Sequence, residues 1–359
     1  MLVVEGGGFL GKPEVLVSKH GGINEAFKDR LLVCSPVKNK VVLVNPEIDS
    51  SLDLKQKEES SLPLFVRSAF PYLIKRKQGE QLLEGWSGHE RSTLFTRKKF
   101  KDKQGRWYRD VDFKGNGYVR NGTVELPGGV ARAGLVGVPS LFGLLEIKEA
   151  FKEYEKSEEF LAAGIRAPRI LAIINLEEII YGGGKLSLEK ARERGIINKD
   201  FQPAILVRAF GTRARPRDIS EGTGLNKETK KVILEDAKEL VGEELGRGKI
   251  NPLTNAEYLD WFAGTLGYNV GMVHRRGDLH GLLSGHNVTL DVRLCDLDTV
   301  EKIKNNKERL DEIRFARNHS LKGMVSSLKL SESCFYIAAN NFQRSYYSAF
   351  HEGERRYGW

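Results

Sequence analysis

The chain has 359 residues, of which 40% are hydrophobic and 29% charged, and this composition fits a globular protein with a sizeable core. The formal net charge is +9, but the basic residues are scattered among acidic ones. Even the densest basic cluster, residues 96–103, has few aromatic rings on which bases could stack. We therefore expect a solvated surface or an acidic or nucleotide ligand, and the charge alone leaves nucleic acid open as a less favoured partner.

The cysteines and the hydropathy pattern exclude several other classes. Cys34, Cys295 and Cys334 are odd in number and far apart, so they form neither a disulfide framework nor a CxxC metal motif. No secretory signal is recognisable, and this predicts a cytoplasmic location. No apolar run approaches the roughly 20 residues that a membrane-spanning helix needs, so no membrane partner is expected.

The first part of the chain has a β-rich pattern. Residues 13–18 and 41–48 are predicted strands, separated by glycine-rich turns, and the polar stretch 51–63 is a predicted connection. Residues 104–119 alternate apolar and polar side chains and predict a strand that ends near Lys114 and turns at Gly115–Gly117. The glycines do not have the GxGxxG spacing of a dinucleotide-binding loop.

The later part is mainly helical. A helix is predicted within residues 140–165, with Gly164 after its last turn, and strands are predicted at 167–185 and 203–212. Helices follow at 226–248 and 255–277, residues 280–300 predict short strands, and 301–350 predicts helices again. The aromatic residues near the C-terminus are expected to pack onto the chain's own helices.

This order predicts an α+β fold of the two-lobed protein-kinase-like type. The expected division is a β-rich N-terminal segment (1–60), a small lobe with one prominent helix (61–200) and a mainly helical large lobe with C-terminal helices (201–359).

Four residues, in the order Lys, Glu, Asn and Asp, could serve phosphoryl or nucleotidyl transfer, which depends on Mg²⁺ and on cations at the phosphates. Lys114, at the end of a strand, could reach a phosphate, and Glu158 on the 140–165 helix could hold that lysine in an ion pair. Asn287 and Asp296 lie on opposite arms of a predicted hairpin and offer the oxygen ligands that Mg²⁺ prefers. In isolation Lys114 and Glu158 are better explained as ordinary surface charges, and it is the order of the four residues on their strand, helix and hairpin that indicates a site.

Six short stretches, in order over roughly residues 85–300, resemble the selenoprotein-O family of pseudokinases, which are protein adenylyltransferases. They are WSGHE (86–90), GRWYRDVDFKGNG (105–117), KEYEKSEEFLAAGIRAPRIL (152–171), AILVRAFGTRAR (204–215), HGLLSGHN (280–287) and LCDLD (294–298). The third stretch matches the family's helix at Glu153, Ser157, Glu158, Gly164, Ile165 and Arg169.

The resemblance implies ATP and Mg²⁺ as cofactors and the transfer of AMP to Ser, Thr or Tyr hydroxyls of a protein substrate. In that family the nucleotide is flipped relative to ordinary kinases. Lys114, paired with Glu158, would then bind phosphate together with Gly115 and Gly117, and Asn287 and Asp296 would hold the metal. The family's two arginines that contact the γ-phosphate end would correspond to Arg208 and Arg215, whose guanidinium groups suit phosphate oxygens.

Several departures from the family pattern bear on catalysis. His286 stands where the family has the aspartate that acts as base, and a neutral imidazole can also accept a proton. Asp278 is a reserve candidate for the base, although nine residues separate it from Asn287. Asp298 replaces a glycine. A zinc site made of His274, His280 and His286 is not favoured, because a six-residue spacing puts them on no common helix face.

Two alternatives to adenylyl transfer stay open. The first is a kinase that transfers the γ-phosphate to a protein or small molecule. The second is a pseudoenzyme that binds nucleotide without turnover, because its base is altered.

Overall fold

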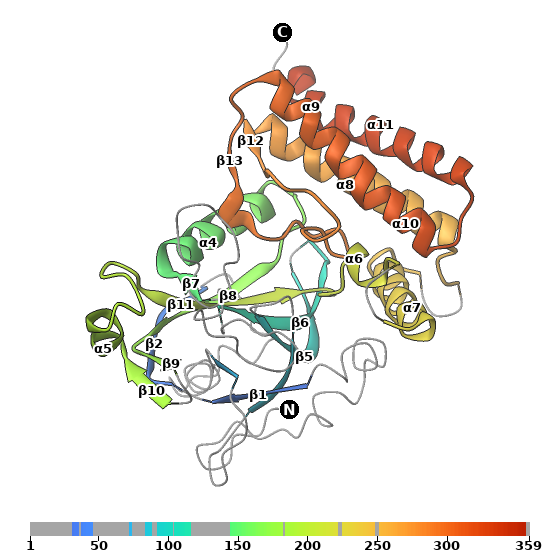
Figure 1. The fold of residues 1–359 in the computed structure, drawn as a ribbon. Helices are drawn as coiled ribbons and strands as arrows, with labels where there is room; N and C mark the ends of the chain where they lie inside the picture. The colour runs from blue at the N-terminus through green and yellow to red at the C-terminus, as the bar shows by residue number, and fades with distance from the viewer. Residues whose placement is uncertain are drawn as a thin grey trace.

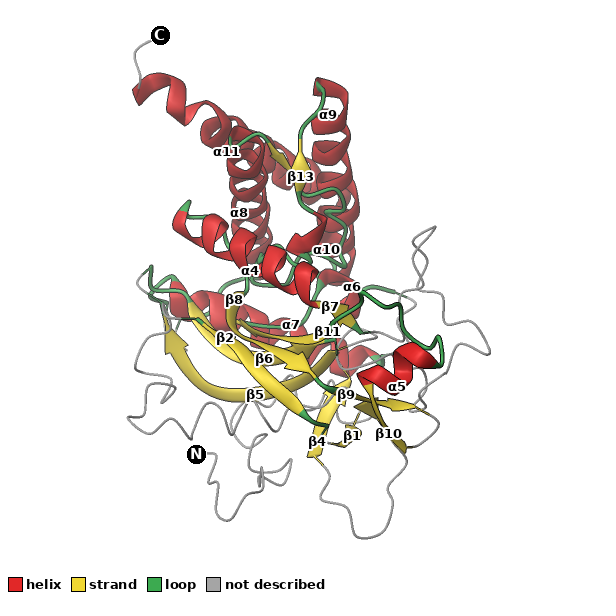
Figure 2. Cartoon of the chain, turned by 90° about the vertical axis from the view of Figure 1, so that its left-hand side faces the viewer, coloured by secondary structure: helices red, strands yellow, loops and turns green. Residues whose placement is uncertain are grey.

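The computed structural model describes residues 31–35, 37–45, 72–73, 83–87, 92–102, 104–115, 144–181, 184–221, 225–247 and 251–356. They form a mixed α/β structure with an antiparallel sheet and several helices, and roughly half of it is helical. The strands gather at one end of the molecule and the long C-terminal helices at the other (Figure 1). Figure 2 shows α4 between these two parts.

The main sheet is antiparallel, and its strands follow the order β2-β8-β11-β6-β5-β4-β1-β3, with the short β7 paired to β11. Its strands are β1 (Leu31–Ser35), β2 (Asn39–Val44), β3 (Tyr72–Leu73), β4 (Leu83–Ser87), β5 (Ser92–Lys101), β6 (Trp107–Lys114), β7 (Leu145–Glu146), β8 (Arg169–Leu176) and β11 (Pro203–Phe210). Every residue of β11 is buried, as its nearly unbroken apolar sequence predicts for a strand covered on both faces.

Two small pairs of strands lie outside that sheet. They are β9 (Glu178–Tyr181) with β10 (Gly184–Ser187), and β12 (Asp278–Leu279) with β13 (Glu301–Lys302). The second pair joins the two ends of the segment that carries Asn287 and Asp296, because β12 precedes this segment and β13 follows it. The ends of the segment are therefore held together by backbone hydrogen bonds.

Several helices begin where the sequence offers a capping side chain. The Asn226 side chain caps α7, and Thr254 with Glu257 forms a reciprocal capping box at α8. The helices are α4 (Ile147–Ala162), α5 (Leu188–Glu193), α6 (Pro216–Ile219), α7 (Lys227–Glu244), α8 (Asn255–Arg275), α9 (Asn306–Phe315), α10 (Lys322–Ser327) and α11 (Glu332–Arg356), with a 3₁₀ turn η3 (Leu297–Thr299) and a π-helical turn η4 (Ala316–Leu321). Among the described residues, no helix combines the length and apolarity that crossing a membrane requires.

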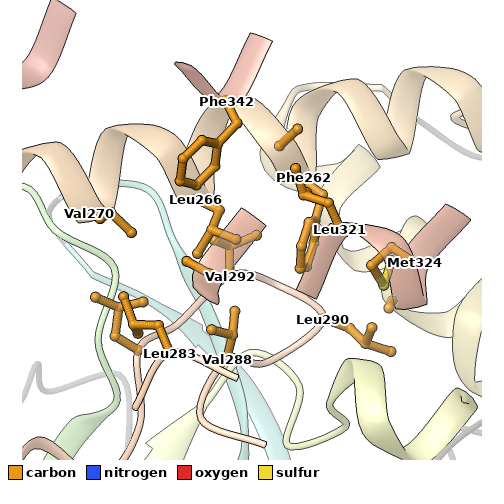
Figure 3. Packing of buried hydrophobic residues seen from close by; sticks show 14 of the residues in the cluster. Phe262, Leu266, Val270, Leu283, Val288, Leu290, Val292, Leu321, Met324 and Phe342 are labelled. Atoms are coloured by element: carbon orange, nitrogen blue, oxygen red, sulfur yellow. The ribbon is translucent and has the colours of Figure 1, made fainter. Parts of the chain in front are cut away.

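Helix α4 connects the sheet to the helical part. Its residue Ala150 packs against Ile170, Ile173 and Leu206 on one face of the sheet. Its C-terminal residues Phe160 and Leu161 instead join the core of the helical part. Figure 3 shows the centre of that core, where α8 and α11 meet the loop of residues 283–292. One helix is thus held by both parts, so charged groups that it carries have a defined position relative to each.

Most predicted elements in the described residues are confirmed. The helix predicted within 140–165 is α4 and ends before Gly164, whose φ is +82°. The strands at 167–185 and 203–212 and the helices at 226–248 and 255–277 are confirmed. The predicted terminal packing is also confirmed, since Phe342 and Tyr346 are buried in the helical core. The strand predicted at 13–18, the connection at 51–63 and Gly117 lie outside the described residues.

The main sheet includes strands from outside residues 61–200, the range expected for the small lobe. Strand β2, from the N-terminal segment, pairs with β8. Strand β11 lies between β8 and β6 although it follows residue 200. Within 280–300 the structure contains mainly turns, with one isolated antiparallel bridge between Val288 and Leu294, where short strands are predicted. Backbone hydrogen bonds of turns, such as that from the amide of Val292 to the carbonyl of Thr289, take the place of a regular strand ladder there.

Candidate functional site

Lys114 is the last residue of β6, and its ammonium group lies among three carboxylates. Its Nζ is 2.6 Å from Glu153 of α4, 3.1 Å from Asp298 and 3.2 Å from Asp296. The Lys114 and Glu153 side chains are almost entirely buried. A buried ammonium group is stable only when opposite charges surround it. Lys114, which the sheet supplies, is therefore held in place by α4 and by the Asp296–Asp298 segment.

The predicted ion pair between Lys114 and Glu158 is wrong, because Glu153 is the partner. Five residues turn a helix by about 140° beyond one full turn, so Glu158 cannot face the same side as Glu153. Glu158 instead lies 3.2 Å from the guanidinium of Arg169 and accepts a hydrogen bond from Asn45.

The carboxylates of Glu153, Asp296 and Asp298 form what we call the carboxylate cluster. One oxygen of each lies within 4.8 Å of the others, a spacing that could hold a metal ion. Asp296 keeps 29% of its side chain exposed and Asp298 14%, so both are accessible from solvent, whereas Glu153 is not. Hard divalent cations take such oxygen ligands.

The charges of the site stabilise one another. Burial by itself would lower the pKa of Lys114, but Asp298, Glu153 and Asp296 outweigh it and raise that pKa. Withdrawal from water would raise the pKa of Asp296, but Lys114, Arg215 and Arg208 hold it well below its ordinary value. Lys114 is therefore a cation and Asp296 an anion at neutral pH.

Asn287 and Asp296 are brought to the same end of a narrow loop, as the hairpin prediction requires. The amide of Cys295 donates to the carbonyl of Asn287 at 2.8 Å, and Val288 bridges to Leu294. The Asn287 side chain donates through Nδ2 to the carbonyl of Leu282 at 2.9 Å, a bond that leaves its oxygen as the atom available to a cation. Asp296 has a left-handed backbone with φ 58°, an uncommon conformation for a non-glycine residue that is enriched at functional sites.

Arg208 is the central cation behind the carboxylate cluster. It makes two parallel bonds of 2.8 Å to Asp112, its cross-strand neighbour, and a third of 2.8 Å to Glu153. Nη1 also lies 3.4 Å from Asp296. Four of its five N–H groups thus already donate to carboxylates, and one N–H on Nη2 is left for a further acceptor. Its observed contacts orient Glu153 and Asp296.

Arg213 and Arg215 each keep one nitrogen without a hydrogen-bond partner among the described residues. Both side chains are buried, and the two nitrogens are Arg213 Nη1 and Arg215 Nε. Arg213 Nε donates to Asp112 at 2.6 Å, and an Arg215 nitrogen donates to the carbonyl of His286. Burial and repulsion from Arg213 lower the pKa of Arg215. A negatively charged ligand would relieve this local excess of positive charge.

His286, the predicted base, is held by Arg217. The ring Nδ1 lies 2.6 Å from Arg217 Nη1, and because a guanidinium can only donate, Nδ1 must accept. Proton abstraction through Nδ1 would require Arg217 to move away, and the role of His286 as base stays a prediction.

Asp278, the reserve base, lies apart from the cluster residues and is surrounded by cations. Lys302 is 2.6 Å away, Arg276 3.7 Å and Lys156 3.8 Å. Among its described contacts none is with Lys114 or with the carboxylate cluster, so the structure does not bring Asp278 to the site.

Gly115 has a steric reason to be glycine. Its φ is +103°, and an added Cβ would lie 2.5 Å from the carbonyl oxygen of Ala204 and 2.9 Å from Leu145 Cβ. This close packing lets β6 turn immediately after Lys114. A contact of Gly115 with nucleotide stays a prediction.

Four site residues were not among those predicted from sequence: Glu153, Asp298, Asp112 and Arg213. Two of them had a signal. Glu153 lies on the apolar stripe of α4, where a charged residue needs a buried partner. Asp112 shares a strand face with Lys114, because side chains two positions apart point the same way. For Asp298 and Arg213 only the three-dimensional arrangement reveals the role.

Asp110 predicts a pH dependence of stability. It is fully buried, one of its oxygens has no hydrogen-bond partner in the described part of the chain, and burial raises its pKa to about 7, with Arg109 opposing this in part. The folded protein therefore holds a proton that the unfolded chain releases near pH 4. Stability from this group is complete below about pH 4 and is lost as the pH rises to about 7, by up to about 4 kcal/mol.

The substitution Asp110→Asn tests this, because asparagine keeps the shape without the charge. We expect the variant to be more stable than wild type at pH 8 and to show a flatter stability profile between pH 5 and pH 8. Urea unfolding at both pH values measures this. An unchanged slope would assign the pH dependence to other groups.

In comparisons with known proteins, no protein-family model matches the chain, and no curated protein matches it.

Proposed function

We propose that the chain is an ATP- and Mg²⁺-dependent transferase of two-lobed, kinase-like fold that transfers AMP to hydroxyl groups of a protein. The observation that carries this proposal is the position of Lys114 between Glu153 of α4 and the acidic pair Asp296 and Asp298. A lysine that a helix carboxylate holds beside partly exposed acids suits a nucleotide with its metal.

In this proposal Asp296 and Asp298 hold Mg²⁺ through carboxylate oxygens, together with Asn287. With Asp296 and Asp298 on the metal, the phosphates would replace these two carboxylates as anionic partners of Lys114, which keeps its ion pair with Glu153. The buried nitrogens of Arg213 and Arg215 that have no hydrogen-bond partner in the described part of the chain support binding of the far end of the phosphate chain. Preorganised cations of this kind stabilise the charge that develops during transfer.

Transfer of AMP rests on the resemblance to the selenoprotein-O family, since the charges around Lys114 would serve transfer of the γ-phosphate equally well. A kinase is therefore the second candidate. A nucleotide-binding pseudoenzyme is the third, and the contact between Arg217 and His286 favours it, because that contact occupies the lone pair that a base would need.

The experiment uses ATP labelled at the α- or the γ-phosphate, with Mg²⁺, the purified chain and a general protein acceptor. We expect label on protein from the α position only. Label from the γ position only would make the chain a kinase, and ATP binding without either label would make it a pseudoenzyme. Absence of Mg²⁺-dependent ATP binding in calorimetry would overturn the proposal.

Asp296→Asn provides the matching variant. Loss of this carboxylate charge should weaken Mg²⁺-dependent ATP binding at least about 10-fold, as expected for a lost ligand. Glu301→Gln is the control, because Glu301 is an exposed acid five positions further along that pairs only with Lys304 among its described contacts. Equal binding by Asp296→Asn and Glu301→Gln would remove Asp296 from the metal site.

A further inference from the structure

Glu312 of α9 is a buried carboxylate that contacts α8 and the start of the 280–287 loop. Its Oε1 accepts from the amide of Gly281 at 2.6 Å, and its Oε2 accepts from the amide of His280 at 3.2 Å. Oε2 also lies 2.7 Å from His274 Nε2 of α8. Burial would raise the pKa of Glu312, but the hydrogen bond from His274 and the neighbouring His280 outweigh it and lower that pKa. The group is therefore an anion that accepts from each of these donors.

His280 extends this connection to the backbone that precedes Asp296. Its Nε2 lies 2.7 Å from the carbonyl of Cys295, and because a carbonyl only accepts, Nε2 must carry a proton. Its Nδ1 is buried and has no hydrogen-bond partner within the described ranges. The His280 ring therefore donates through Nε2 to the carbonyl of Cys295.

The contacts of Glu312 and of His280 hold the two ends of the segment between residues 280 and 296. Glu312 holds the start of residues 280–287, the stretch that ends at Asn287, and His280 holds the strained residue Asp296 through the carbonyl before it. The hydroxyl of Thr299 donates to the His280 carbonyl at 2.9 Å and closes the arrangement. None of these groups belongs to the carboxylate cluster, yet they contact the backbone at both ends of the segment that carries the two proposed metal ligands.

We propose that Glu312 is a positioning residue that holds the 280–287 loop and, through His280, the Cys295–Asp296 backbone in the geometry that presents Asn287 and Asp296 to a metal ion. This inference rests on the proposed function. Groups that orient metal ligands without touching the metal commonly change metal affinity 10- to 100-fold when they are replaced.

The substitution Glu312→Gln tests the proposal in the full-length chain. A carboxamide has one acceptor oxygen, so its NH₂ group must face at least one of the donors that Glu312 accepts from. We expect the apparent Kd for Mg²⁺, from titration of Mg²⁺ into protein with ATP, to rise at least about 10-fold. ATP binding without Mg²⁺ should change less than about 2-fold. Glu312→Asp keeps the charge and should recover part of the loss.

Hydrogen exchange provides a second readout that does not depend on nucleotide. In Glu312→Gln the amides of His280, Gly281 and Cys295 should exchange faster, while those in the middle of α8 should not. Leu176→Ala, which disturbs the separate hydrophobic cluster of the sheet, is the control for lost stability: it should leave the Kd for Mg²⁺ and the exchange of these amides unchanged.

Unchanged exchange at these amides in Glu312→Gln would overturn the positioning role, and so would a Kd for Mg²⁺ equal to that of wild type. If wild type itself shows no Mg²⁺-dependent ATP binding, the proposed function fails. In that case the exchange data still decide whether Glu312 holds the loop.

Discussion

Replacement of Glu153 by Gln is expected to destabilise the protein by about 3 kcal/mol or more. The substitution removes the buried charge that Lys114 and Arg208 share, and both cations stay buried. Removal of one partner of a buried ion pair typically costs about 3–5 kcal/mol, because the remaining charge is not compensated. Urea unfolding measures the loss, and calorimetry at a temperature where the variant is folded should show weaker Mg²⁺-dependent ATP binding.

Glu158→Gln is the matched control on the same helix. Its ion pair with Arg169 is partly exposed, with 24% and 13% of the two side chains accessible. Such pairs contribute about 1 kcal/mol or less, so stability and ATP binding should remain close to wild type. Equal losses in the two variants would contradict the assignment of Glu153 as the partner of Lys114.

Gly267→Ala is expected to destabilise the contact between α8 and α11 by about 2–3 kcal/mol. A Cβ at this position would lie 2.1 Å from the carbonyl oxygen of Phe342, a backbone atom that can move only with its helix. Overpacking of this kind costs about 1–3 kcal/mol or more, which exceeds the gain of about 1 kcal/mol from the better helix propensity of alanine. Thermal and urea unfolding measure the change.

The nearby Gly264 is a control in the same helix. A Cβ there would meet the ends of the Asn341 and Ser345 side chains at 3.1 and 3.4 Å, and both can rotate away. Gly264→Ala should therefore be neutral or stabilising by up to about 1 kcal/mol. A similar loss in both variants would mean that packing between the backbones of α8 and α11 is not the cause.

The sequence predicted the main helices and strands because their patterns are local. The burial of Ala150, Glu153, Ser157 and Phe160 follows the three- and four-residue spacing of one helix face. The same spacing, applied to the charged residues, would have favoured Glu153 over Glu158. The family resemblance implies Glu158 as the partner of Lys114, whereas the periodicity of α4 indicates Glu153.

Residues 280–300 were harder to predict because their backbone hydrogen bonds are not regular. The alternating apolar residues Val288, Leu290, Val292 and Leu294 are typical of a strand, and all of them are buried. These residues form turns, however, and not a strand. Tyr258 donates a hydrogen bond to the carbonyl of Leu290, and Asn269 donates one to the carbonyl of Val292. Side chains from α8 satisfy groups that a neighbouring strand would otherwise satisfy.

From sequence alone, the mixed α/β class, the position of Lys114 at a strand end and the hairpin-like approach of Asn287 to Asp296 were predictable, because each depends on neighbours within about 10 residues. The partner of Lys114, the participation of Asp298, Asp112 and Arg213, and the anchoring of the loop by Glu312 were not. These contacts join polar groups that lie between 31 and 184 residues apart. Only the packing of α4 between the sheet and the helices, and of α9 against the 280–287 loop, brings these groups within bonding distance.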